Sequence, residues 1–200
     1  MDINTAWEEL RTRVASCRKC KLCETRKNTV LGEGPIENCR CVIIGEAPGE
    51  EEDESGRPFV GKAGQLLTNI LEKGGGIPRS SLYIMNVLKC RPPENRDPTV
   101  RETLACNEFL EAQLALLHPD IVVTMGNVPT KWLLKTSQGI TKLRGEFTDW
   151  MGIKVFPMFH PSYLLRNESN AVGSPKYLTW QDIMKLKAKL DTLAKLDTRS

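Results

Sequence analysis

Short, continuous apolar runs recur along the chain and predict the strands of a buried sheet. The first is Cys41–Gly45, and the second is Leu82–Leu88, which Asn86 interrupts. Asp120–Gly126 is the third, and Lys154–Phe159 is the fourth, although its proline cannot donate a ladder hydrogen bond. Continuous rather than alternating apolar residues are typical of parallel strands that are buried on both faces.

Helical periodicity fills the segments between these runs and both ends of the chain. Apolar residues recur every fourth position in Asn4–Ser16, and Thr99–Leu117 opens with a capping-box pattern, TVRE. Shorter helical patterns cover Gly61–Gly74 and Asn127–Thr136, and a C-terminal helix is expected over about 177–196. Strands that alternate with helices predict an α/β fold, a three-layer α/β/α sandwich with a central four-stranded, mainly parallel sheet.

Length and composition limit the class of protein. The 200 residues are 40% apolar and 26% charged, which predicts a single globular domain over residues 1–200. The net charge of +3 permits nucleic-acid binding without requiring it. The N-terminal residues do not resemble a secretory signal, and no apolar run approaches the ~20 residues of a membrane span. We therefore expect a cytoplasmic protein with no membrane contact, a setting in which structural disulfides are rare.

Seven cysteines in such a protein favour metal or catalytic roles for some of them. In the cysteine-rich segment 17–41, Cys17 and Cys20 form a C-x2-C pair that is suited to chelating a metal. Cys90 and Cys106 are candidates for two further ligands, although each also fits a buried core position. Spacing does not separate zinc from iron–sulfur, and other cysteines compete for the same role: Cys23, Cys39 and Cys41.

The loops after the strands deserve most attention, because ligands bind beyond the carboxyl ends of parallel strands. The first strand runs into the sharp turn Gly45-Glu46-Ala47-Pro48-Gly49, whose backbone N–H groups can face a ligand. Carboxylates here, Glu46 and Glu52 among them, can activate water, bind Mg²⁺ or exclude a wrong substrate. A solvated acidic loop is the alternative interpretation.

Two further residues suit the binding of a flat, polar ring. Phe59 lies between glycines and a proline in the loop GRPFVGKAG, where an aromatic side chain can stack on a nucleobase. It can equally serve as a hydrophobic staple for the following helix. Asn86 offers a donor and an acceptor side by side, which match a pyrimidine edge, unless the neighbouring backbone satisfies it.

The last strand leads into the sequence FHPSYLLRN. At the strand end, His160 can donate a hydrogen bond to developing negative charge. Leu164, Leu165 and Arg166 predict a protruding helical turn with an apolar tip beside a cation, a shape that can wedge into a base stack. Core packing is the alternative for the leucines. The other histidine, His118, stands at a helix end and is interpreted as structural.

Taken in order, these motifs resemble one family, the iron–sulfur uracil-DNA glycosylases, which are family 4 of their superfamily. The resemblance runs from about Cys17 to Leu190 through CRKC, TRKNTVLGEG, GEAPGEEED, GRPFVGKAGQLL, NVLKCRPPENRDP and FHPSYLLR. The related family X carries a longer basic insertion after the asparagine strand. This chain lacks that insertion, because the strand runs directly into Lys89-Cys90-Arg91.

The resemblance implies an enzyme that flips uracil out of DNA and hydrolyses its N-glycosidic bond, which leaves an abasic site. It implies that Phe59 stacks on uracil, that Asn86 reads its Watson–Crick edge, and that His160 stabilises charge on O2. It further implies that Leu164 to Arg166 enter the duplex, and that the turn from Glu46 to Gly49 forms the pocket wall and holds water. Finally, it implies a [4Fe–4S] cluster, held by Cys17, Cys20, Cys90 and Cys106.

The chain departs from the pattern of the superfamily at one position, which affects how the attacking water is held. Other families of the superfamily place Asp or Asn at the position of Ala47, which has no polar side chain. The water must then be held by backbone, by Glu46 or Glu52, or by the amide of Asn95. Glu52 or the turn at Gly49 is expected to exclude the methyl group of thymine.

The expected partner is uracil-containing DNA, single- or double-stranded, bound by a monomer. The C-terminal tail after Leu190 is free to contact a further partner, such as a replication clamp. The alternative function is that of a non-enzymatic or redox iron–sulfur protein that binds nucleic acid. Such a protein would not need Phe59, Asn86 and His160 to converge on one pocket.

Overall fold

The computed structural model describes residues 2–197 and contains one five-stranded sheet with strand order β2-β1-β3-β5-β4. Four strands are parallel and correspond to the four predicted apolar runs. The fifth, β4, is a short antiparallel edge strand that the sequence did not predict. The strands are β1 (Cys41–Gly45), β2 (Tyr83–Asn86), β3 (Ile121–Met125), β4 (Thr148–Trp150) and β5 (Ile153–Met158).

Pro157 fits into β5 because its position in the strand needs no backbone hydrogen-bond donor. Its carbonyl accepts a hydrogen bond from the backbone N–H of Gly145 at 2.9 Å, so its ring nitrogen also faces away from β3. The pairing of β4 with β5 ends at Val155, before the proline is reached. The missing donor therefore removes no ladder bond, and the register with β3 continues through Met158.

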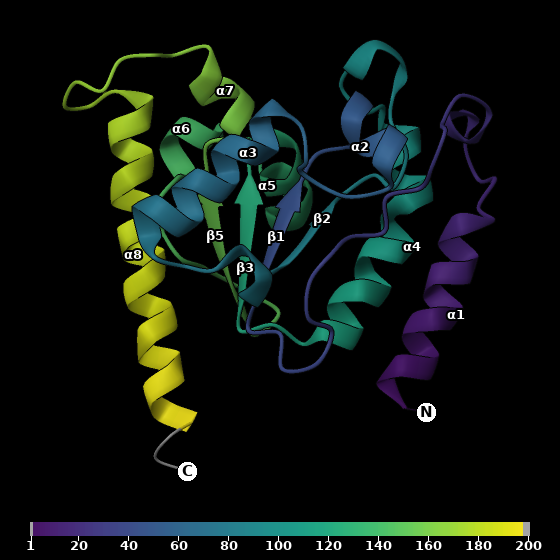
Figure 1. Cartoon of the computed structure of the whole chain (residues 1–200), viewed down its shortest axis with the longest axis horizontal. Helices are drawn as coiled ribbons and strands as arrows, with labels where there is room; N and C mark the ends of the chain where they lie inside the picture. The colour runs from purple at the N-terminus through teal and green to yellow at the C-terminus, as the bar shows by residue number, and fades with distance from the viewer. Residues whose placement is uncertain (1, 198–200) are drawn as a thin grey trace.

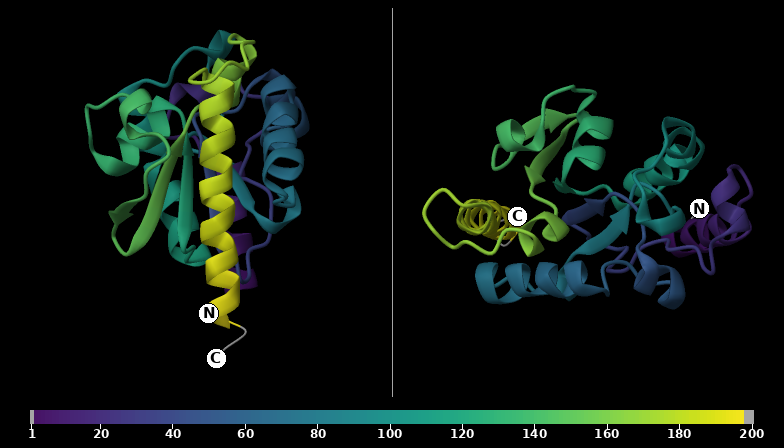
Figure 2. Two further views of the ribbon diagram at one scale, coloured as in Figure 1. Left: turned by 90° about the vertical axis from the view of Figure 1, so that its left-hand side faces the viewer. Right: turned by 90° about the horizontal axis from the view of Figure 1, so that it is seen from above.

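Helices cover both faces of the sheet, which confirms the three-layer architecture (Figures 1 and 2). Alternate residues of β1 divide between the two cores, with Ile43 in one hydrophobic cluster and Ile44 in the other. Ile43 belongs to the cluster beneath α3 (Lys62–Asn69), the π-helical turn η2 (Ile70–Gly74) and α8 (Pro175–Asp197). The opposite cluster includes residues of α1 (Ile3–Ala15), α4 (Val100–Leu117) and α5 (Asn127–Leu134).

The predicted capping box at the start of α4 is present. The Glu102 N–H donates to Thr99 Oγ1 at 3.3 Å, and the Thr99 N–H donates to Glu102 Oε2 at 2.8 Å. The helix ends at His118, which adopts a left-handed conformation with φ 43°. The structural role expected for His118 is therefore that of a helix C-cap.

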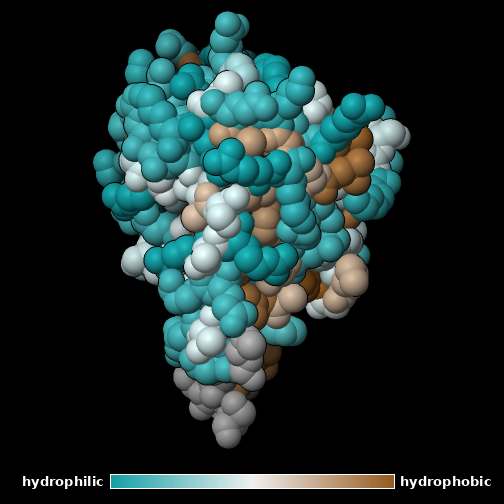
Figure 3. Space-filling view, turned by 90° about the vertical axis from the view of Figure 1, so that its right-hand side faces the viewer, coloured by the Kyte–Doolittle hydropathy of each residue, from teal (hydrophilic) through white to brown (hydrophobic). Residues whose placement is uncertain are grey.

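Short helices gather beside the carboxyl ends of the parallel strands, at the upper edge in Figure 1. Hydrophilic side chains cover most of the molecular face on the α1 side, which Figure 3 shows. Among residues 2–197, no helix combines the length and the apolar character that a bilayer span requires. These short helices are η1 (Lys21–Glu24), α2 (Glu50–Ser55), η4 (Pro93–Asn95), α6 (Ile140–Leu143) and α7 (Pro161–Leu165), whereas η3 (Arg79–Ser81) precedes β2 at its amino end.

Candidate active site

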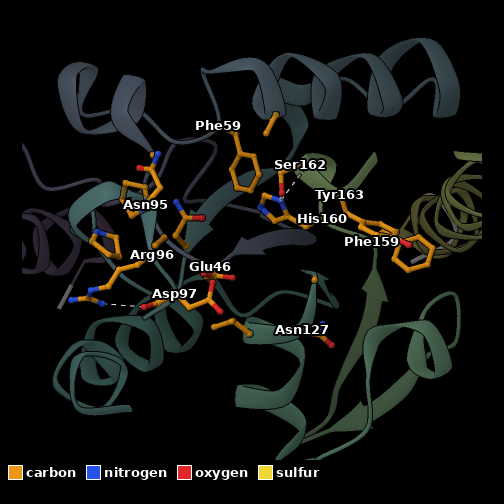
Figure 4. Close-up of a pocket in the computed structure, with 18 of the residues that line it drawn as sticks. Glu46, Phe59, Asn95, Arg96, Asp97, Asn127, Phe159, His160, Ser162 and Tyr163 are labelled. Carbon is orange, nitrogen blue, oxygen red and sulfur yellow. Dashed lines mark hydrogen bonds between the residues drawn. The ribbon is translucent and has the colours of Figure 1, made fainter. Parts of the chain in front are cut away.

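A pocket opens at the carboxyl ends of the parallel strands, and the loops that follow β1, β2, β3 and β5 all contribute to it (Figure 4). Parallel pairing explains the convergence, since the register places Gly45 beside Asn86 and Met125 beside Met158. Most of the sequence-predicted site residues line this pocket: Glu46, Ala47, Pro48, Gly49, Glu52, Phe59, Asn86, Asn95, His160 and Arg166.

Two aromatic rings face one another in the pocket. The ring centroids of Phe59 and His160 lie 5.8 Å apart, with an interplanar angle of 36°. Gly45 lies directly behind Phe59, since a Cβ at that position would be 2.5 Å from Phe59 Cζ and 2.3 Å from Asn86 Oδ1. Gly45 is therefore needed so that both side chains can approach the end of β1.

The backbone around Phe59 is held in an unusual conformation. Phe59 has φ 51°, a left-handed value that is costly for an aromatic residue. Its carbonyl packs against Gly64 of α3, where an added Cβ would lie only 1.9 Å from the Phe59 oxygen. Arg79 Nη2 also donates to the carbonyl of Pro58 at 2.7 Å. These contacts fix the ring where it both lines the pocket and packs in the hydrophobic cluster that contains Leu67 of α3.

The carboxylate of Glu52 is committed to backbone amides. Oε1 accepts hydrogen bonds from the N–H groups of Val60 and Gly61, both at 2.9 Å, and Oε2 accepts one from Gly49 at 3.1 Å. Glu52 therefore joins the turn after β1 to the loop that carries Phe59. These bonds favour a positioning role over the water-activating role that the sequence suggested.

Asn86 ends β2, with 2% of its surface exposed, and its side chain lines the pocket. Among the hydrogen bonds of residues 2–197, none involves its carboxamide. The alternative in which neighbouring backbone satisfies this side chain is therefore wrong. The donor and the acceptor of Asn86 are both available to a ligand.

The protonation of His160 follows from its contacts. Nδ1 accepts a hydrogen bond from the Ser162 N–H at 3.2 Å and lies 2.8 Å from Ser162 Oγ. Burial lowers the pKa of His160 to about 4, and the charge of Arg166 acts in the same direction. The ring is thus neutral near pH 7, and because Nδ1 is an acceptor, the proton is assigned to Nε2. The pocket gains an uncharged N–H donor.

Glu46 and Asp97 lie close together on another side of the pocket (Figure 4). Burial raises the pKa of Glu46 to about 7, and the charge of Asp97 contributes in the same direction. The carboxyl group is therefore close to half ionised at neutral pH. Asn95 also lines the pocket, but its Oδ1 already accepts from Arg91 Nε at 2.8 Å.

Sequence reasoning did not single out Arg96, Asp97 or Ser162 as parts of the site. Arg96 forms a two-pronged ion pair with Glu102, at 2.9 and 2.6 Å, which anchors the loop carrying Asp97 to α4. The capping-box pattern identified Glu102 but gave no sign of this second partner. The bond of Ser162 to the imidazole could have been predicted, because Ser162 lies two residues after His160 at the start of a helix.

The predicted apolar tip is smaller than expected. Leu164 is 1% exposed and packs in the core with Ile140 and Phe159, so the core alternative holds for this residue. Leu165 is 44% exposed, and Arg166 lines the pocket. Of the three residues predicted for the tip, Leu165 and Arg166 are therefore the two at the surface beside the pocket.

Five cysteines line a second, smaller cavity, which lies between the end of α1, η1, α4 and the loop after β2. Cys39 and Cys41 are buried in the hydrophobic clusters on the two faces of the sheet and do not line this cavity. This location leaves five cysteines, rather than seven, as candidate ligands for a metal in this cavity. The cysteines of the cavity are Cys17, Cys20, Cys23, Cys90 and Cys106.

Donors surround these sulfur atoms. Arg26 Nη1 donates to Cys90 Sγ at 3.2 Å, and the backbone N–H of Lys89 donates to Cys106 Sγ at 3.3 Å. Burial raises the pKa of Cys90 to about 11, against the opposing effect of Arg26, so without a bound metal this group is a neutral thiol near pH 7. Within residues 2–197, no three His, Cys, Asp or Glu side chains meet closely enough to hold a single ion. The donor set itself suits an iron–sulfur group, because thiols are the ligands of such clusters and five of them line this cavity.

Comparison with known proteins agrees with this geometry. Residues 31–184 match the family model of the uracil DNA glycosylase superfamily. A type-4 uracil-DNA glycosylase of Thermotoga maritima is 48% identical over 88% of this chain and 90% of its own. Relatives of the same name from Sulfurisphaera tokodaii and Saccharolobus solfataricus are both 44% identical, over 80% and 77% of this chain and 76% and 74% of theirs. The chain therefore belongs to the uracil-DNA glycosylase superfamily and, within it, to the type-4 family.

Proposed function

We propose that this protein is a DNA repair glycosylase that flips uracil out of DNA and hydrolyses its N-glycosidic bond, leaving an abasic site. The observation that carries the proposal is the convergence of Phe59, Asn86 and His160 on one pocket. A uracil inside a duplex is inaccessible, so the nucleotide must leave the stack at a cost of roughly a few kcal/mol. Leu165 and Arg166, beside the pocket, are placed to occupy the space that the base leaves.

Base recognition follows from two side chains. The ring of Phe59 offers a flat, buried face on which the flipped base stacks. The Oδ1 atom of Asn86 accepts the N3–H of uracil, while Nδ2 donates to O4. This pairing uses both free polar groups of the carboxamide.

Cleavage breaks the bond between sugar C1′ and base N1. The bonding electron pair leaves with the base, so uracil becomes an anion with charge on O2, and the sugar becomes oxocarbenium-like. His160 donates its Nε2–H to O2 as that charge develops. A single preorganised donor of this kind is worth on the order of 10²–10³ in rate.

Water then adds to C1′ and loses a proton, and the uracil anion takes up a proton, so that the products are uracil and an abasic sugar. Glu46 is the group that we assign to the water and to the sugar cation. Its pKa of about 7 suits a base that works at neutral pH. Ala47 has no polar group to offer, and the carboxylate of Glu52 already accepts three backbone hydrogen bonds. Asn95 is a weaker candidate, because its Oδ1 is bound to Arg91.

The resident cofactor in this proposal is a [4Fe–4S] cluster held by Cys17, Cys20, Cys90 and Cys106. All four line one cavity: Cys17 and Cys20 lie in the segment between α1 and η1, Cys90 follows β2, and Cys106 lies on α4. When bound, the cluster supplies a cross-link among these segments. Since the loop after β2 also follows Asn86, such a cross-link steadies one wall of the uracil pocket.

The proposal also covers the domain organisation, the oligomeric state and the location of the protein. The chain forms one domain and acts as a monomer on single- or double-stranded uracil-containing DNA. Free cysteines suit the reducing cytoplasm, which we propose as its location. Contact with a replication clamp through the segment after Leu190 is also a proposal. The helix α8 continues there to Asp197, with Leu193 packed against the core, and residues 198–200 lie outside the described residues.

The test is incubation with uracil-containing single- and double-stranded oligonucleotides, followed by alkaline cleavage of abasic sites. The wild-type protein is expected to cut at uracil, and Asn86→Ala and His160→Ala are expected to lose that activity while keeping the brown colour of the cluster. An iron–sulfur protein that only binds nucleic acid would leave uracil in place. Absence of cutting by well-folded, brown wild-type protein would contradict the proposed function.

A further inference from the structure

We propose that Lys89 is a positioning residue that couples the cysteine site to Asn86. The proposal rests on the function proposed above, in which Asn86 reads the base and the cysteines hold a cluster. Lys89 is 1% exposed and is among the largest fully buried side chains of the protein. A lysine buried this deeply is rare unless its charge is paired.

The side chain of Lys89 returns to the end of its own strand. Its Nζ donates to the backbone oxygen of Asn86 at 2.6 Å, so the ammonium holds the peptide group that follows the base-reading residue. The backbone N–H of Lys89 donates to Cys106 Sγ at 3.3 Å, and its carbonyl accepts from the Val30 N–H at 2.8 Å. One residue therefore contacts the pocket wall, a proposed cluster ligand on α4 and the N-terminal loop.

The charge of Lys89 lacks a carboxylate partner. Among residues 2–197, no salt bridge involves Lys89, and the only acceptor of its ammonium is the Asn86 carbonyl. A buried ammonium without opposite charge is strongly disfavoured. Lys89 lines the same cavity as Cys90 and Cys106, so the thiolates of a bound cluster would place negative charge beside it.

Three hydrogen bonds hold the backbone at the end of β2, and Lys89 makes the one to the Asn86 carbonyl itself. The Val87 N–H donates to the Gly45 carbonyl at 2.9 Å, and the Leu88 N–H donates to the Glu46 carbonyl at 3.0 Å. These two bonds hold the chain after Asn86 through its N–H groups, whereas the Asn86 carbonyl itself is held by Lys89. A displacement of about 1 Å at a substrate-positioning group can cost about 10²-fold in rate. The coupling thus links the occupancy of the cysteine site to the excision rate.

The first test uses Lys89→Met in the cluster-loaded, full-length protein. Methionine fills similar space without charge, and such replacements of buried charges often leave a fold intact. We expect iron content and DNA affinity near the wild-type values, since phosphate contacts dominate DNA binding. The single-turnover excision rate should fall by about 10- to 100-fold. The midpoint reduction potential of the cluster, titrated with dithionite, should become more negative, since a nearby positive charge favours the reduced form.

A matched control is Lys19→Met. Lys19 lines the same cavity but pairs with Glu108 on the surface and does not contact Asn86. This variant should also make the midpoint potential more negative while excising uracil at the wild-type rate. It separates the effect of charge near the cysteines from the positioning of Asn86.

A second variant, Lys89→Gln, keeps a donor for the Asn86 carbonyl but removes the charge. Its midpoint potential should fall as in Lys89→Met, and its excision rate should lie between those of Lys89→Met and the wild type. If Lys89→Met does not fold or loses iron, this variant decides the question. Failure of the wild type to excise uracil would count against the proposed function itself. An active wild type with a Lys89 variant of equal rate, or of unchanged midpoint potential, overturns the coupling alone.

Discussion

The imidazole of His160 accepts, through Nδ1, a hydrogen bond from the backbone N–H of Ser162, 3.2 Å away. This single contact fixes the tautomer, because a neutral ring that accepts at Nδ1 carries its proton at Nε2. The Ser162 hydroxyl lies 2.8 Å from the same nitrogen, so two groups share the task of orienting the ring.

Ser162→Ala removes the hydroxyl but keeps the backbone donor, so the tautomer should survive. We expect excision to fall by less than about tenfold, against about 10²–10³-fold for His160→Ala, which loses the donor to O2. Single-turnover rates on a uracil-containing duplex provide the measurement. A loss in Ser162→Ala as large as that in His160→Ala would show that the hydroxyl, and not the backbone, sets the tautomer.

The pH dependence of excision should come from Glu46. The pKa of His160, lowered to about 4 by burial, keeps that ring neutral at every pH above about 5. The pKa of Glu46, raised to about 7 by burial, places its ionisation in the physiological range. If ionised Glu46 stabilises the sugar cation and the water, kcat/KM should rise as pH increases through about 7.

Glu46→Gln checks this assignment. The variant should be slower at pH 8 and should show a flat profile between about pH 5 and pH 8. A profile that keeps its acid limb in Glu46→Gln would assign that limb to another group.

The same carboxyl group should also affect stability. The folded pKa of about 7 lies above the usual 4.5, so ionisation favours the unfolded state increasingly as pH rises between these two values. Glu46→Gln should therefore melt at a higher temperature than the wild type at pH 8 and at the same temperature at pH 4. Thermal unfolding at both pH values provides the measurement, and equal melting temperatures at pH 8 would contradict the raised pKa.

A single methyl group at Gly45 should disrupt base recognition. The Cβ of Gly45→Ala would lie 2.3 Å from Asn86 Oδ1 and 2.5 Å from Phe59 Cζ, so both side chains must move. Overpacking of this kind costs about 1–3 kcal/mol of stability. We expect the affinity for uracil-containing DNA over undamaged DNA to fall, together with the excision rate.

Gly139→Ala is a matched control. Gly139 has φ −79°, and a Cβ there would meet no atom within 4 Å. This variant should bind and excise uracil like the wild type. Wild-type activity in Gly45→Ala would mean that the ends of β1 and β2 move apart more readily than their contacts indicate.

The parallel strands could be predicted because each is a continuous apolar run that is buried on both faces. The edge strand β4 could not, since Thr148, Asp149 and Trp150 are exposed or half-buried and carry no apolar pattern. The acidic stretch after Gly49, for which a solvated loop was the alternative interpretation, forms the helix α2, and Glu52 caps it by accepting from the Gly49 N–H. A short helix with such a cap needs little apolar periodicity.

The site residues, too, divide into those that the sequence could predict and those that it could not. Phe59, Asn86 and His160 could be recognised, because each is a polar or aromatic exception within a loop or an apolar strand. The proximity of Asp97 to Glu46 could not, because it depends on the bond between Arg96 and Glu102, which folds one loop over the pocket. The sequence left Leu164 open between a protruding tip and the core, and only the path of α7 shows that it faces the core.

Two neighbouring cysteines, Cys20 and Cys23, are both placed where a cluster ligand is needed. Cys23 lines the same cavity as the four proposed ligands, and its backbone N–H donates to the Cys20 carbonyl at 3.2 Å. The C-x2-C spacing and the family resemblance favour Cys20, so Cys20→Ser should lose the brown colour and most of its iron, while Cys23→Ser should keep both. Visible absorption and iron analysis of the two purified variants provide the comparison. Colour that survives in Cys20→Ser but disappears in the Cys20→Ser/Cys23→Ser double variant would instead identify Cys23 as a replacement ligand, held within reach by the η1 turn.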